Sequence, residues 1–209
     1  MEASEQLTGN AQGAFVWGDE PQAKFVLASD AVSDPLDHVL TFLLDCTVKA
    51  LVPRDSSLNV PGLPLVEGEG DRFPIFPPDK PARLPALLES GDGRVLTISH
   101  WGDTTDRPGV KFWAGAGGYP GAALARDAVE LLSAGLGNYE ARPFEFGALQ
   151  SSSFRFDWRR DYVPIDVGFS PNDQQAVVMT GYPLVELLAA LGMEHARPTR
   201  VSALEYRYE

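Results

Sequence analysis

The sequence predicts an α+β domain, and three observations support this class. Apolar residues recur at helical spacing in residues 34–51, 120–136 and 181–193. Segments of strand character lie before, between and after them, and the order lacks the regular strand–helix–strand alternation of a doubly wound parallel sheet. The 209 residues, 44% of them hydrophobic, suffice for one domain over residues 1–209 with a substantial core.

The first third of the chain contains the clearest predicted helix. Residues 1–13 are polar and are expected to be disordered or loosely attached, and residues 15–29 predict a β-hairpin, or a pair of strand edges, around the turn sequence GDEP. In residues 34–51, Asp34 can cap a helix and Pro35 suits its first position. Cys46 lies in this apolar run and is expected to be a small core residue.

Residues 52–93 are rich in proline and glycine and predict an irregular insertion or interaction loop. Within it, ARLPALLES (82–90) could form one short helix. Beyond it, residues 94–103 and 110–115 predict a hairpin, and residues 120–136 predict a helix. Further strands are expected within 144–170, then a helix over 181–193 and a final strand over 201–208.

The net charge of −12 and the pI near 4.6 count against a free-standing nucleic-acid-binding protein, which usually has a basic face. The basic residues are nonetheless mostly arginines, which suit planar contacts with phosphates, carboxylates and stacked rings. The sequence has one cysteine and no apolar run of about 18 residues. We therefore expect a cytoplasmic protein with no membrane partner.

The most distinctive stretch is a glycine-rich loop, KFWAGAGGYPGAALAR (111–126), between a predicted strand and a predicted helix. Its candidate binding residues are Gly115, Gly117 and Gly118. Backbone amides there could bind an anion, aided by the helix dipole. No Gly-Lys-Ser/Thr follows, and the spacing G-x-G-G-x-x-G does not fit a dinucleotide fingerprint. A plain turn, contact with nucleic acid and a nucleotide site all stay open.

Two further groups could contact nucleic acid. Trp101, Lys111 and Trp113 interleave a cation with aromatic rings, which suits single strands, although core packing also explains the tryptophans. The second group consists of the three arginines of the segment RFDWRRDY, which could contact phosphates. The alternative interpretation is that these arginines form surface ion pairs with Asp157 and Asp161. These arginines are Arg155, Arg159 and Arg160.

Catalysis finds little support in the sequence. The histidines His38, His100 and His195 are far apart, and the sequence lacks H-E-x-x-H, C-x-x-C and G-x-S-x-G motifs. We therefore expect a protein that is not an enzyme and that needs no cofactor or metal.

Several segments together resemble one known family. They are HWGDTTDRPGVKFWAGAGGYPGA, SSFRFDWRRDYVPIDVGFS and YPLVELLAALGMEHARP, within residues 95–209. These segments are similar to the "W-x-D … K-x-W-A-G", "F-D-W-R … D-x-G-F-S" and "P-x-x-E-L-L-A" motifs of the third small RAMP-type subunit family of type I-G (formerly I-U) CRISPR systems.

The resemblance implies a ferredoxin-like, RRM-related core and a non-catalytic role in an antiviral, RNA-guided effector complex. The implied partners are CRISPR RNA and other effector subunits, with target DNA as a further candidate. It also implies that the glycine loop and the arginine group contact RNA or a partner. Two alternatives stay open: an acidic adaptor that does not touch RNA, and an enzyme that uses the glycine loop for a phosphorylated substrate.

Overall fold

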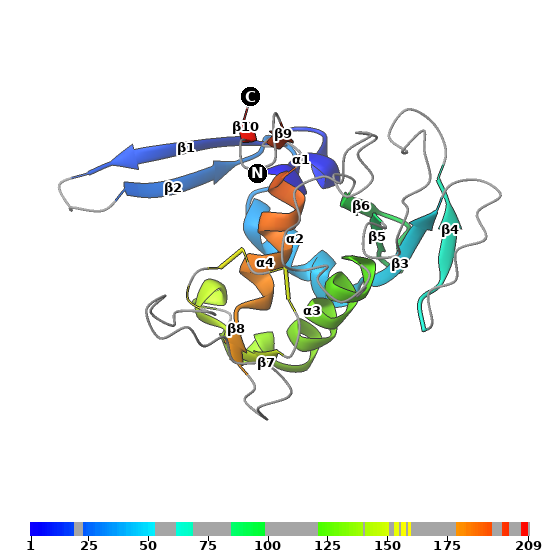
Figure 1. Ribbon diagram of the computed structural model, residues 1–209. Helices are drawn as coiled ribbons and strands as arrows, with labels where there is room; N and C mark the ends of the chain where they lie inside the picture. Colours follow the sequence, from blue (N-terminus) through cyan, green and yellow to red (C-terminus); the bar gives the residue numbers. More distant parts are fainter. Residues whose placement is uncertain are drawn as a thin grey trace.

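The computed structural model has an α+β architecture in which a four-stranded sheet packs against helices (Figure 1). The structure describes residues 1–18, 23–52, 62–68, 85–98, 121–139, 141–150, 153–154, 156–157, 159, 179–193, 198–200 and 206–208. No helix in this part of the chain is long and apolar enough to cross a membrane.

The sheet has the strand order β4-β3-β5-β6. Its strands are β3 (Thr47–Val52), β4 (Leu65–Glu67), β5 (Ala86–Glu89) and β6 (Val95–Ile98). β4 pairs with β3 in parallel, whereas β3 with β5 and β5 with β6 are antiparallel. The register aligns buried side chains in rows on one face, because alternate residues of a strand point to the same side. One row runs through Val48, Leu88 and Leu96.

Helix α3 (Gly121–Gly135) packs against β3 and β5, and also contacts α2 (Pro35–Asp45) and α4 (Pro183–Gly192). Small residues at its start, together with Leu124 and Leu132, are buried, so the helix can approach its neighbours closely. Figure 1 shows α2, α3 and α4 gathered beside the sheet. The helices expected at 120–136 and 181–193 are therefore confirmed.

The helix expected over residues 34–51 is shorter than predicted. Asp34 caps it, accepting a hydrogen bond from the Asp37 amide at 3.0 Å, but the helix ends at Asp45. The next residue, Cys46, has an extended backbone, and β3 begins at Thr47. β-branched residues favour a strand there, and the apolar spacing of this segment also fits the buried face of a sheet. Cys46 is buried as expected, and burial raises the pKa of its thiol to about 12.

Two other predictions need correction. Residues 2–8, expected to be loosely attached, form helix α1 (Glu2–Thr8), whose Ala3 is buried against the core. Its C-cap Gly9 has a φ of 70°, a conformation that glycine adopts without strain. The segment expected as a short helix at 82–90 contains strand β5 instead, because Ala86 and Leu88 alternate with outward-facing residues and complete the buried rows.

The remaining described elements are short, apart from one hairpin. The predicted hairpin forms as β1 (Gln12–Trp17) and β2 (Ala23–Ala28), which pair antiparallel and project from the body (Figure 1). Residues 143–145 form a 3₁₀ turn in place of the expected strand start, and β7 (Ala148–Gln150) pairs with β8 (Met179–Gly181). Near the C-terminus, β9 (Pro198–Arg200) pairs with β10 (Tyr206–Tyr208). β10 lies within the final strand expected over residues 201–208.

Candidate functional site

The structure describes one of the nine residues proposed from sequence as contacts for RNA or a partner, namely Arg159. The other eight lie outside the described residues: Trp101, Lys111, Trp113, Gly115, Gly117, Gly118, Arg155 and Arg160. The candidate site is therefore built around Arg159 and the groups that hold it.

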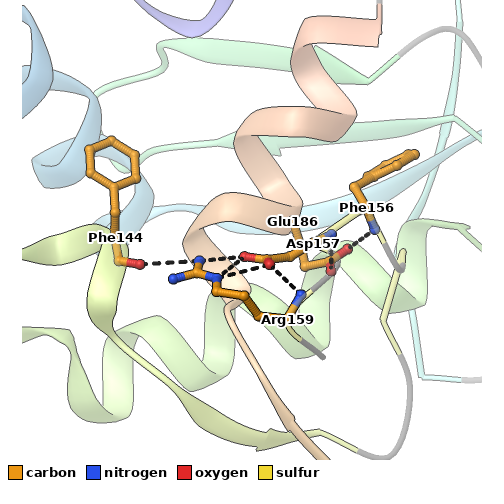
Figure 2. Close-up of polar contacts among 5 residues, drawn as sticks. All are labelled: Phe144, Phe156, Asp157, Arg159 and Glu186. Carbon is orange, nitrogen blue, oxygen red and sulfur yellow. Dashed lines mark hydrogen bonds and ion pairs between the residues drawn. The ribbon is translucent and has the colours of Figure 1, made fainter. Parts of the chain in front are cut away.

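The segment that carries Arg159 is fixed to α4 by a buried carboxylate. Glu186 lies in the first turns of α4, on the same face as Leu187 and Ala190, and is 0% exposed. Its two carboxylate oxygens accept hydrogen bonds from the backbone N–H groups of Phe156 at 3.0 Å and Asp157 at 3.1 Å (Figure 2). A buried carboxylate is costly unless it is hydrogen-bonded, so these two bonds fix the path of the chain at residues 156–157.

Asp157 in turn holds the arginine. Its carboxylate accepts a hydrogen bond from the backbone N–H of Arg159 at 2.9 Å, which closes a local turn. The same carboxylate accepts from Nε of Arg159 at 2.9 and 3.0 Å and forms a close ion pair with Nη2. This two-pronged geometry sets the plane of the guanidinium group.

Two further contacts surround the guanidinium group. Its carbon lies 3.5 Å from the centroid of the Tyr182 ring, and Tyr182 is the N-cap residue of α4. Nη2 also donates to the carbonyl oxygen of Phe144 at 3.4 Å (Figure 2). Cation–π stacking and the bonds to Asp157 thus orient Arg159 before any ligand arrives.

The Arg159 side chain nevertheless keeps 32% of its surface exposed, whereas that of Asp157 keeps 3%. No acceptor within the described part of the chain bonds to Nη1 of Arg159, so this atom could donate to an external oxygen. The arrangement presents an oriented cation next to an aromatic ring, which suits a phosphate, a carboxylate or a stacked base.

Electrostatics keeps this pair charged. The hydrogen bond from the Arg159 side chain lowers the pKa of Asp157 below its ordinary value of 3.8, although burial opposes the shift. The same hydrogen bond raises the pKa of Arg159. The sequence-based alternative of an ion pair therefore describes part of what Arg159 does, while its exposed edge is still available.

A second polar cluster lies at the start of α2 and β6. Arg94 bonds to Asp92 through Nε at 2.7 Å, and its Nη1 lies 2.9 Å from Nε2 of His38. Its guanidinium also lies over the Phe42 ring, 5.8 Å from the centroid. This cluster ties α2 to the β5–β6 turn, and it gives His38 a structural partner in Arg94. No group of three candidate metal ligands occurs among the described residues.

Sequence reasoning missed Glu186 and Tyr182, although one signal was visible. Glu186 is the only charged residue in the apolar helix PLVELLAALG, and such a residue in a buried helix face needs a partner. The partner amides belong to Phe156 and Asp157, 30 and 29 residues earlier, a distance that no local pattern reveals.

No protein-family model, no curated protein and no solved structure was found to match this chain.

Proposed function

We propose that this chain is a non-catalytic subunit of a type I CRISPR RNA-guided effector complex, in which it contacts guide RNA and neighbouring subunits. The proposal starts from the resemblance of residues 95–209 to the RAMP-type subunit family described above. It includes a ferredoxin-like core, and the sheet packed against helices supports the broader α+β class of that proposal.

The observation that carries the proposal is the geometry of Arg159. The segment FDWR belongs to the family-like part of the sequence, and here it is anchored by Glu186. The Arg159 guanidinium is oriented by Asp157 and Tyr182, yet its side chain keeps 32% of its surface exposed, where a phosphate oxygen could approach it. A fixed, exposed arginine beside an aromatic ring supports contact with a nucleic-acid backbone, because little side-chain entropy is lost on binding.

Salt-dependent RNA binding tests this role. The chain is co-expressed with the products of its neighbouring genes, and the purified assembly is titrated with guide RNA at several salt concentrations. We expect Arg159→Gln to weaken binding at least about fivefold and to reduce the slope of log K against log salt by about 0.7, the value for one lost single-strand phosphate contact. The RNA affinity of Arg159→Lys should lie between those of the wild type and Arg159→Gln, because lysine keeps the charge but lacks the planar guanidinium group.

Arg142→Gln is the matched control, since Arg142 is 74% exposed and pairs with Glu145 near the same surface. It should leave affinity and slope unchanged, and thermal unfolding must show that every variant is folded. A folded Arg159→Gln assembly with wild-type affinity and slope would remove Arg159 from the interface. An assembly without RNA would refute the function itself.

A second candidate is an acidic adaptor that joins other proteins without touching RNA. The net charge of −12 favours it, as does the close ion pair that already occupies one edge of Arg159. A gel shift with the isolated chain at low salt separates the two roles, because an adaptor of this charge should not retard guide RNA.

A further inference from the structure

The β1–β2 hairpin exposes apolar side chains on both faces, although Gln12 and Lys24 share the face of Val16 and Val26. All six residues of β1 are exposed, and Phe15 and Trp17 keep 72% and 76% of their surface. Phe15 pairs with Phe25 across the hairpin, with ring centroids 5.2 Å apart. Val16 and Val26 lie on the opposite face, and each is 48% exposed.

The hairpin is also unprotected at its edges. The two strands contain no proline and one charged residue, Lys24, whereas solvent-exposed edges usually carry charges or prolines that prevent pairing. A two-stranded hairpin is marginally stable alone. Figure 1 shows it extending away from the sheet and helices that form the core. Another surface is therefore needed to cover it.

The exposed area has the size of a docking surface. With about 150–250 Å² per aromatic side chain, the three exposed rings offer on the order of 400 Å². This is about half of the roughly 800 Å² that each partner contributes to a standard protein interface. The largest exposed apolar patch of a typical soluble monomer is of about this size, and such a patch is often functional.

Charge selects the class of partner. Single-stranded nucleic acid needs cations beside the rings, but Lys24 is the sole basic residue of the two strands. The sequence that joins the strands, GDEPQ, contributes two carboxylates and no cation, which disfavours an anionic membrane. A second copy would bring together two chains of net charge −12. A basic protein has the complementary charge.

We propose that the β1–β2 hairpin is a docking arm that inserts into an apolar groove of a different protein chain with basic net charge. A groove fits the arm better than a flat surface does, because it would cover the aromatic face together with Val16 and Val26 on the other face. This proposal deepens the proposed function: it rests on membership in a multi-subunit assembly, but not on contact with RNA. The arm also lies outside residues 95–209, which carry the family resemblance.

Site-specific photo-crosslinking tests the occupant. The full chain, with p-benzoyl-phenylalanine in place of Phe15, is irradiated in cells that also express its neighbouring genes. The same amino acid in place of Leu149, which is 68% exposed on β7, is the control. We expect a protein adduct of basic net charge at position 15 and none at position 149. Adducts with a second copy, RNA or lipid, or the absence of any adduct, would overturn the proposal.

The partner identified in this way is then purified and its affinity is measured. The double variant Phe15→Ser, Trp17→Ser should weaken binding at least about tenfold, as expected for central aromatic anchors. Leu149→Ser should change the affinity less than about twofold. Equal effects of both variants on the affinity would refute the role of the hairpin as a docking arm. RNA contact at Arg159 without an arm adduct would overturn this inference alone. An arm adduct in an assembly lacking RNA would instead overturn the proposed function.

Discussion

At the scale of single residues, the candidate site is organised by two buried carboxylates, those of Glu186 and Asp157, which act one after the other. Glu186 satisfies two backbone amides, and this places Asp157 where its own carboxylate can hold Arg159. Each acid is therefore hydrogen-bonded to donors that fix its position. The arginine owes its orientation to Asp157 and to the ring of Tyr182.

The lowered pKa of Asp157 predicts an acid-sensitive contribution to stability. Because the folded pKa lies below the ordinary value of 3.8, the ionised form is favoured in the folded state. This contribution is complete above about pH 5 and is lost as the pH falls through the folded pKa. Asp157→Asn should therefore reduce the free energy of unfolding by about 1–3 kcal/mol at pH 7. Urea unfolding between pH 2.5 and 7 should show this difference shrinking below pH 4.

The exposed aspartate Asp30 offers a control, since it accepts one bond from the Asn10 side chain. Asp30→Asn should change the free energy of unfolding by less than about 0.5 kcal/mol at pH 7. If the effect of Asp157→Asn stayed constant down to pH 2.5, its cause would be packing rather than the charged pair.

At the scale of elements, helix α1 closes an open edge of the sheet. Thr97 lies on β6, the outer strand, and its N–H donates to Oε1 of Gln6 at 2.8 Å. Nε2 of Gln6 donates to the carbonyl oxygen of Thr97 at 3.3 Å. The amide thus imitates the backbone of a neighbouring strand, which explains why the polar N-terminal segment is ordered against the core.

Replacing this amide should loosen the N-terminal segment and expose β6. Gln6→Ala removes both bonds to Thr97, and we expect a loss of about 1–2 kcal/mol in the free energy of unfolding. Hydrogen exchange at the Thr97 amide should accelerate at least about tenfold, because it loses its acceptor. Gln12→Ala, at an exposed position of β1, is the control and should change neither quantity. Unchanged exchange at Thr97 would show that backbone packing, not Gln6, protects this edge.

The elements also show where sequence patterns suffice. The helices α3 and α4 are long apolar segments ended by glycine, so their spacing alone defines them. The α2–β3 junction is different, since Val48 and Leu51 continue the helical spacing yet belong to a strand. Pairing with β5, formed by residues about 40 positions later, decides that segment. Local periodicity carries no information about such a partner.

At the scale of the whole molecule, the same distinction governs the site. The arginine-rich segment was recognisable from its residue types, but its anchor Glu186 and its stacking partner Tyr182 come from the start of a helix beyond residue 180. The sequence likewise predicted the hairpin over 15–29 without indicating that both of its faces would be exposed. Exposure depends on what the rest of the chain covers, and the core is built mainly from the sheet and the helices α2, α3 and α4.

This division predicts that the arm and the core respond differently to substitution. Phe42 lies on the buried face of α2 and is 0% exposed, and Phe42→Ala should lower the free energy of unfolding by about 3–5 kcal/mol. Trp17→Ser on the arm should cost less than about 1 kcal/mol, since it loses only cross-strand contacts. Urea unfolding of the isolated chain measures both. A loss at Trp17 comparable to that at Phe42 would mean that the hairpin packs against the core in solution, and it would then not be available as a docking arm.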